Sequence, residues 1–151
     1  MSSSSVERAK KPLATTKKQK QALKTIENNE VIFIEGLAGT SKTHLSVRYA
    51  AWALLEGHFK KIIITRPAVA CEEEIGFLPG PLEEKLSPYL QPIYEQLGAY
   101  FPKQILNKLM QDEIIKIVPF SFMRGCNFHD SVVILDETQN CTFISLNRRR
   151  M

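Results

Sequence analysis

The stretch that decides the fold reads Gly36-Leu37-Ala38-Gly39-Thr40-Ser41-Lys42-Thr43. Such a pattern is typical of a phosphate-binding loop that connects a strand to a helix. Its glycines permit a tight turn in which backbone N–H groups converge on a phosphate, and the following helix directs its positive end at the same anion. We therefore expect residues 36–43 to bind the phosphates of ATP. Lys42 would neutralise the β and γ oxygens, and Thr43 would give its hydroxyl to Mg²⁺.

The loop departs from the usual pattern at Ser41, where a glycine normally precedes the lysine. If this residue adopts right-handed helical angles, serine costs little and can cap the helix. If close approach of a phosphate requires glycine, the affinity for the nucleotide falls. The alternative interpretation of the whole stretch is a capped strand-to-helix turn without a ligand, but its position between a strand pattern and a helix pattern favours the phosphate site.

The segments around the loop predict a βαβ unit. Val31–Glu35 is apolar and β-branched, as expected of a buried parallel strand, and Lys61–Thr65 repeats that pattern. Between them, residues 42–56 have helical spacing of apolar side chains, and Gly57 can take the left-handed position just past the helix end. This order implies an α/β fold with a parallel sheet and right-handed crossovers.

A second motif lies at Val132-Val-Ile-Leu-Asp136-Glu137, an apolar strand that ends in two carboxylates. An acidic pair after a strand is by itself more often a plain turn. Beside a phosphate-binding loop, however, it has the Walker B pattern, in which the strand's carboxyl end lies next to the loop. We expect Asp136 to hold Mg²⁺ and Glu137 to act as the general base.

The remaining chain predicts three segments of different character. Residues 1–16 are interpreted as a disordered basic leader, 17–147 as a partial ATPase domain, and 148–151 as a basic tail. Residues 66–101, interrupted by prolines, are expected to form an irregular excursion with short helices, of which Pro81 and Pro88 could each open one. Further elements are expected at Lys17–Glu27 and Lys103–Met110, both helices, and at Ile114–Val118 and Ser131–Leu135, both strands.

Composition indicates one ordinary globular domain, with 151 residues, 44% apolar and 24% charged. No apolar run approaches the roughly 18 residues of a membrane span, and the start lacks a secretory signal, so we expect a cytoplasmic protein without a membrane partner. The three cysteines predict no disulfide framework. Cys126 and His129 have ligand-like spacing but no second pair, so we expect no metal other than Mg²⁺.

The formal net charge of +4 comes from the ends of the chain. Residues 1–20 carry six Lys or Arg against one Glu, a balance of +5, and Arg148-Arg149-Arg150 add +3, which leaves −4 between them. Basic ends can hold nucleic acid through phosphate contacts, yet short lysine-rich termini are more often solvated tails. Charge alone therefore leaves nucleic-acid binding open.

Six blocks in order make the chain, from about Thr16 to Thr142, resemble the PhoH family of ATPases, relatives of superfamily-one helicases with a RecA-like core. The blocks are Gly36–Thr43, Thr65–Val69, Gly76–Gly80, Pro88–Pro92, Met123–Gly125 and Asp136–Asn140. The resemblance implies that Gln19 reads the adenine edge and that Gln139 couples the γ-phosphate to movement. It also implies that Arg66 contacts the nucleic-acid backbone, that Arg124 contacts RNA, and that full-length relatives often assemble into homo-oligomeric rings. From the residues alone, Arg66 is as readily a strand-ending arginine in a surface salt bridge. Gln19 is then a helix-surface residue and Gln139 a turn amide.

The resemblance also implies missing parts. After Asn140 the family continues through a helix, another strand and arginines for the γ-phosphate, whereas this sequence stops at Met151. In RecA-like sheets that strand lies between the phosphate-loop strand and the Walker B strand. We therefore expect a truncated or frame-disrupted family member, with a slot in the centre of its sheet.

Three functions compete at this stage. The leading one is a Mg²⁺-dependent ATPase coupled to single-stranded RNA, associated with helicase or ribonuclease activity in fuller relatives. The alternative is a non-catalytic nucleotide-binding remnant that keeps Lys42 and Thr43. A small-molecule kinase is disfavoured, because a glutamate directly after the Walker B aspartate suits activation of water better than transfer to a metabolite.

Overall fold

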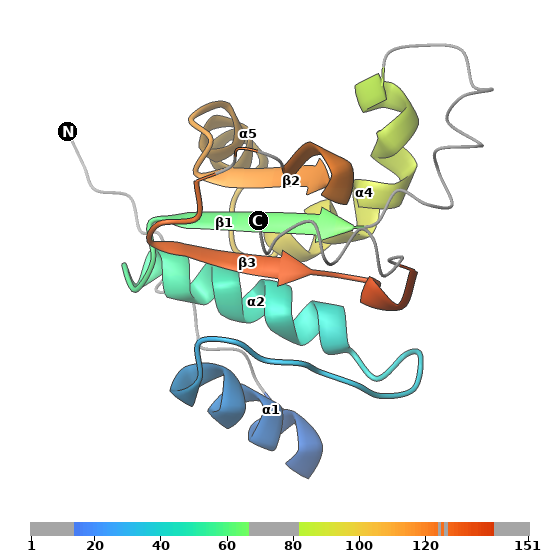
Figure 1. Ribbon diagram of the computed structural model, residues 1–151. Coiled ribbons are helices and arrows are strands. Elements are labelled where there is room, and N and C mark those ends of the chain that lie inside the picture. Colours follow the sequence, from blue (N-terminus) through green and yellow to red (C-terminus); the bar gives the residue numbers. More distant parts are fainter. Residues whose placement is uncertain (1–13, 67–81, 124, 126, 141–151) are drawn as a thin grey trace.

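Three parallel strands form the centre of the structure: β1 (Lys61–Arg66), β2 (Ile115–Pro119) and β3 (Ser131–Leu135). The computed structural model describes residues 14–66, 82–123, 125 and 127–140. Within them the strand order is β2-β1-β3, with all strands pointing the same way (Figure 1). Thr65 of β1 lies opposite Val118 on one side and Leu135 on the other. The expected α/β class, with a parallel sheet flanked by helices, is confirmed.

The helices lie close to the ranges expected from the sequence, with one exception described below. They are α1 (Lys17–Asn28), α2 (Lys42–Leu55), α4 (Leu82–Gly98) and α5 (Lys103–Gln111), with the 3-10 helices η1 (Phe120–Met123) and η2 (Thr138–Asn140). Thr16 caps α1 through a reciprocal capping box. Gly57 follows α2 with a φ of 76°, the left-handed conformation predicted for it.

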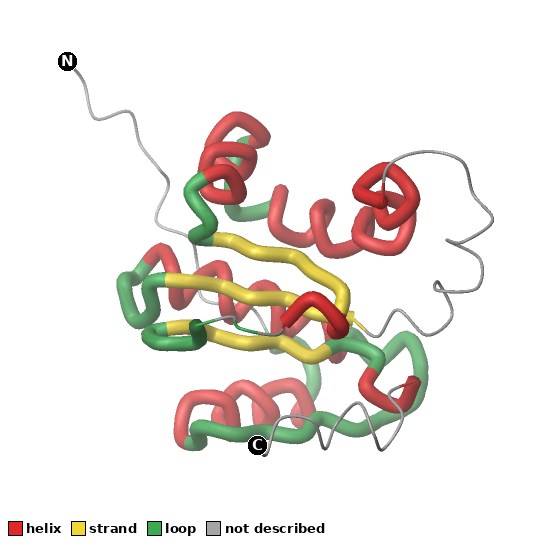
Figure 2. The backbone as a smooth tube through the Cα atoms, turned by 45° about the horizontal axis from the view of Figure 1, so that its top comes forward, coloured by secondary structure: helices red, strands yellow, loops and turns green. Residues whose placement is uncertain are grey.

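The core lies between one face of the sheet and the helices behind it (Figure 2). Ile62 and Ile64 alternate with Ile63 along β1, so they share the face that packs against α2 and α4. The buried cluster also contains Val47, Ala50, Ala51, Leu90, Ile93, Leu97, Phe101, Leu106 and Ile115. Small alanines on α2 let that helix approach the sheet closely, which positions its first turn beside the carboxyl ends of the strands.

The expectation of short helices between residues 66 and 101 is wrong for its second half. Residues 82–98 form a single helix, α4, and Pro88 lies inside it instead of opening a helix. A proline in a helix interior costs about 3 kcal/mol. Leu90, Ile93 and Leu97 recur at helical spacing and are at most 8% exposed, and their burial offsets that cost. Pro81 lies outside the described residues.

The strand predicted at Val31–Glu35 is also wrong. The backbone between α1 and α2 forms a loop on the β3 side of the sheet and joins no strand (Figures 1 and 2). Val31 is 76% exposed and Phe33 90% exposed. Among the described residues β3 pairs only with β1. The other edge of β3 therefore has no neighbouring strand that would connect it to residues 31–35. An apolar run becomes a strand only when backbone partners lie beside it, and none of the described strands pairs with this segment.

None of the helices in the described part of the chain combines the length and apolarity needed to span a bilayer.

Candidate functional site

The phosphate-loop motif forms a turn that leads directly into α2. Lys42 is the first residue of that helix, and its ammonium donates hydrogen bonds to the carbonyl oxygens of Gly36 at 2.8 Å and Leu37 at 2.9 Å. Thr40 donates its hydroxyl to the same Leu37 carbonyl at 2.8 Å. The lysine thus closes the loop upon itself, at the place where a phosphate would otherwise neutralise its charge.

The loop retains the features of an anion site. Gly39 and Ser41 both have left-handed backbone angles, with φ of 75° and 64°, and such turns direct N–H groups toward a concavity. The side chain of Ser41 makes no hydrogen bond to the first N–H groups of α2. These groups carry the positive end of the helix dipole, so they are suited to phosphate oxygens. Ala38 and Leu37 are exposed at the tip of the turn.

The left-handed conformation of Ser41 excludes the first of the two interpretations left open by the sequence. With φ of 64° and ψ of 28° and no capping hydrogen bond, serine neither adopts helical angles nor caps α2. The glycine usual at this position would adopt these angles without steric cost. Ser41 therefore introduces backbone strain into the loop, of about 1–2 kcal/mol.

We expect Ser41→Gly to stabilise the chain by roughly 0.5–1 kcal/mol, since relief of strain exceeds the entropy that glycine adds to the unfolded state. Urea unfolding followed by fluorescence of Trp52, the single tryptophan, measures the difference. Ser41→Ala is the matched control, because alanine keeps the strain and should bring no gain. Equal stability of the glycine and alanine variants would contradict the assignment of strain.

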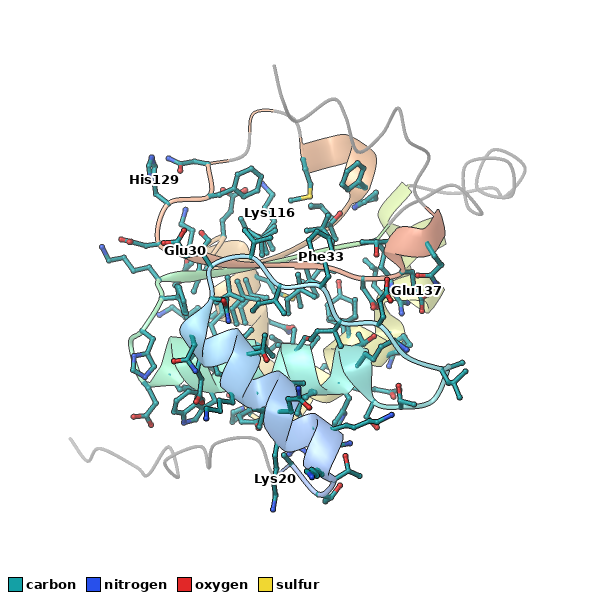
Figure 3. The ribbon with its side chains drawn as sticks, turned by 60° about the horizontal axis from the view of Figure 1, so that its bottom comes forward. Lys20, Glu30, Phe33, Lys116, His129 and Glu137 are labelled. Carbon is teal, nitrogen blue, oxygen red and sulfur yellow. The ribbon has the colours of Figure 1, made fainter. Side chains whose placement is uncertain are left out.

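The second motif meets the loop at the end of β3. Asp136, 93 residues away from Thr43 in the chain, accepts the hydrogen bond of the Thr43 hydroxyl at 2.6 Å through Oδ1. Asp136 is 8% exposed, and its backbone N–H donates to the carbonyl of Thr65 at 2.9 Å. Figure 3 shows Glu137 at the same end of the molecule as the turn of the phosphate loop. The structure thus brings together the residues predicted to hold Mg²⁺.

The donor set at this point fits Mg²⁺. A hydroxyl oxygen and a carboxylate oxygen meet, and both are hard ligands of the kind that magnesium prefers. Within the described residues no group of three or more His, Cys, Asp and Glu side chains is placed to hold a metal. A site of one or two protein oxygens suits magnesium, which keeps several waters and takes its other ligands from the nucleotide phosphates.

The structure places Arg66 at the carboxylates, not on a separate surface. Its Nε donates to Asp136 Oδ2 at 2.7 Å, and its Nη2 lies 3.9 Å from Glu137 Oε1. The side chains of Arg66 and Asp136 are 24% and 10% exposed, so solvent screens this ion pair weakly. Sequence reasoning assigned Arg66 to nucleic acid, with a surface salt bridge at the strand end as the alternative, and did not identify its partners. One signal could have revealed the contact. Arg66 is the last residue of its strand, and that strand precedes the Walker B strand in the chain.

Glu137 and Gln139 contact each other. Gln139, within η2, donates its amide to Glu137 Oε2 in a short hydrogen bond. Glu137 has a φ of 54°, a left-handed conformation that is uncommon for glutamate. The predicted base and the predicted coupling residue therefore share one corner of the site.

Gln19, another of the predicted residues, makes its described contacts at the start of α1. The Oε1 atom of Gln19 accepts hydrogen bonds from Thr15 N–H at 2.9 Å, from the Thr15 hydroxyl at 2.8 Å and from Thr16 N–H at 3.2 Å. These bonds occupy its carbonyl oxygen in the cap of α1, and its role at adenine stays a prediction. Arg124 lies outside the described residues.

His44, next to Thr43 on α2, makes stability depend on pH. Burial, and then the positive charge of Arg48 nearby, lower the pKa of His44 below its ordinary value of 6.5. The unfolded chain therefore binds the proton more readily, and stability present above pH 6.5 is lost as the pH falls through the folded-state pKa. We expect His44→Gln to reduce this loss, measured as the difference in thermal midpoint between pH 7.5 and 5.5. Identical pH dependence of the thermal midpoint in the wild type and in His44→Gln would contradict the assignment to His44.

A model of the family described as PhoH-like protein matches residues 13–148 of the chain. The chain belongs to this family. It is 47% identical over 124 residues to a PhoH-like protein of Bacillus subtilis and 42% identical over 132 residues to Protein PhoH of Escherichia coli K12. A PhoH-like protein of Synechocystis is 40% identical over 129 residues.

These matches cover 82%, 86% and 85% of the present PhoH-like chain. They cover 39%, 37% and 39% of the relatives' own lengths. The chain thus spans less than two fifths of each relative that it matches. The family indicated by the sequence motifs is confirmed.

Proposed function

We propose that this chain binds Mg²⁺-ATP, and that the same site in a complete PhoH-like protein hydrolyses ATP in a manner coupled to single-stranded RNA. The observation that supports this most directly is the 2.6 Å hydrogen bond between Thr43 and Asp136. It joins two motifs far apart in the chain, each of which predicted half of a phosphate and magnesium site. A turn without a ligand would not require the buried carboxylate beside the loop's threonine.

Each residue has a distinct part in the proposed reaction. Lys42 exchanges the carbonyls of Gly36 and Leu37 for phosphate oxygens, which match its charge better. Thr43 and Asp136 would hold Mg²⁺, and the bound metal would supply positive charge that stabilises the phosphate oxygens. Glu137 accepts a proton from the water that attacks the γ-phosphorus, while the bond from that phosphorus to the bridging oxygen breaks and ADP leaves.

The coupling to RNA rests on family resemblance. Arg124 lies outside the described residues, and the described contacts of Arg66 include Asp136 and Glu137. Release of phosphate, measured with and without single-stranded RNA of mixed sequence, tests the coupling in the chain and in a full-length PhoH-like relative. Equal rates in both conditions for the full-length protein would contradict it.

We expect Glu137→Gln to separate binding from hydrolysis. The amide keeps the size and the hydrogen-bonding capacity of the side chain but cannot take a proton, so the hydrolysis rate should fall about 100-fold. ATP affinity, measured by calorimetry, should stay within about twofold because Glu137 lies on the water side of the proposed reaction. A parallel loss of affinity would instead assign Glu137 to nucleotide binding.

One observation favours the second candidate, a nucleotide-binding remnant without turnover. Residues 31–35, which lead into the phosphate loop, lie outside the sheet, and Phe33 is 90% exposed. The segment that leads into the loop therefore lacks the support of a sheet, and catalysis depends on precise positioning. Stabilisation by Mg²⁺-ATP without detectable phosphate release from this chain would support the remnant, whereas multiple turnovers would exclude it.

A further inference from the structure

The sheet itself builds the contact between Arg66 and the two carboxylates. Thr65 pairs with Leu135 across β1 and β3, so the next residues of the two strands, Arg66 and Asp136, are cross-strand neighbours. The hydrogen bond from Asp136 N–H to the Thr65 carbonyl extends the ladder to this point. Neighbours in register project on the same side of a parallel sheet. Strand register therefore places the two residues side by side at the carboxyl ends of β1 and β3.

Both oxygens of Asp136 are engaged in this arrangement. Oδ1 accepts from the Thr43 hydroxyl at 2.6 Å, and Oδ2 accepts from Arg66 Nε at 2.7 Å. Glu137 is restrained from two sides, by Arg66 Nη2 at 3.9 Å and by the amide of Gln139. A guanidinium and a divalent cation at the same carboxylate repel each other, and the small exposure of the pair leaves little water to screen them.

We propose that Arg66 is a positioning residue that holds Asp136 and Glu137 together in the metal-free site and is displaced when Mg²⁺ binds. Binding of Mg²⁺ and release of the Arg66 guanidinium from the carboxylates are then one event. The same event frees Glu137 to orient water. The proposal rests on the proposed function, because it assigns a regulatory step to that site. It also explains why an arginine, with donors on two sides of a planar fork, ends β1: a single guanidinium reaches both carboxylates.

The test compares affinity for ATP in EDTA with affinity for ATP in excess Mg²⁺, measured by calorimetry on the intact chain. In the wild type, displacing Arg66 offsets part of the ATP affinity that Mg²⁺ adds. In Arg66→Gln the added affinity should therefore be larger, and the ratio of the affinity in Mg²⁺ to the affinity in EDTA should rise about fivefold or more. A residue that merely supported the fold would weaken both affinities or reduce the gain.

Lys60→Gln is the matched control. Lys60 lies at the opposite end of β1, forms an ion pair with Asp130 at 2.8 Å, and loses the same charge on substitution. In Lys60→Gln the ratio of the ATP affinity in Mg²⁺ to that in EDTA should remain within about twofold of the wild-type ratio. Arg66→Lys serves as the second variant if the glutamine variant does not fold. Lysine keeps the charge but lacks the planar fork of arginine, so the ratio in Arg66→Lys should lie between those of wild type and Arg66→Gln.

The outcomes separate the two proposals. A wild type that binds ATP neither in EDTA nor in Mg²⁺ overturns the proposed function and this inference together. A wild type that gains affinity from Mg²⁺, with an equal or smaller gain in the folded Arg66 variants, overturns the inference alone. A larger gain in the Arg66 variants, absent from Lys60→Gln, supports both.

Discussion

Lys42→Ala is expected to abolish the stabilisation of this chain by Mg²⁺-ATP. A ligand at a hundredfold excess over its dissociation constant adds about 2.7 kcal/mol to the free energy of unfolding. For a chain of this size that corresponds to a rise of roughly 5–10 °C in the thermal midpoint. The ammonium of Lys42 already lies within 2.9 Å of two carbonyls of the phosphate loop, so its removal takes the central cation from the site.

Trp52 is a suitable reporter for this measurement. It lies in α2, which Lys42 begins, and its ring lies 5.6 Å from that of Tyr49 and 5.3 Å from that of His58. Lys20→Ala is the control, because Lys20 is exposed on α1 (Figure 3) and loses the same charge. A wild-type midpoint that does not respond to Mg²⁺-ATP would refute the phosphate site. A response to Mg²⁺-ATP that survives in Lys42→Ala would place the nucleotide at another part of the chain.

Asp136→Ala is expected to lower the stability of the chain without any ligand. The substitution removes the carboxylate to which the Thr43 hydroxyl and Arg66 Nε both donate, in a place where Asp136 is only 8% exposed. Arg66 keeps Glu137 at 3.9 Å. Loss of one partner of a shielded ion pair leaves the other charge poorly solvated. Because Arg66 retains 24% exposure, we expect a loss of about 2 kcal/mol, at the lower end of the effect of breaking buried pairs.

Asp136→Asn separates charge from hydrogen bonding in the same experiment. The amide keeps the shape of the side chain and one acceptor oxygen, so this variant should lose less stability than Asp136→Ala. It should still lose the stabilising effect of Mg²⁺. Chemical denaturation without nucleotide gives the difference between the two variants. An alanine variant within about 0.5 kcal/mol of the wild type would show that the three side chains do not stabilise one another.

Local sequence determined much of this protein. The spacing of apolar residues in 17–28, 42–55 and 103–111 predicted three helices, since one buried face repeats every third or fourth position. The β-branched runs before Arg66 and Asp136 predicted two parallel strands. The phosphate-loop motif and the paired carboxylates indicated which residues meet, because in parallel sheets the strand ends and the following loops gather at one edge.

Other features could not be predicted from local patterns. Residues 31–35 have a strand-like sequence yet stay outside the sheet, because a strand requires backbone partners that lie elsewhere in the chain. Residues 82–98 contain prolines yet form one helix, because burial of Leu90, Ile93 and Leu97 exceeds the local cost. The position of Ser41 in the left-handed region likewise depends on how the turn closes onto α2.

The contact of Arg66 with Asp136 belongs to tertiary structure alone. The two residues are 70 positions apart, and only the register of β1 against β3 makes them neighbours. The sequence therefore indicated which residues carry the proposed chemistry, because their types and spacing suit phosphate and magnesium. Tertiary structure decided which charges share the site, because strand pairing sets distances between residues that no local pattern connects.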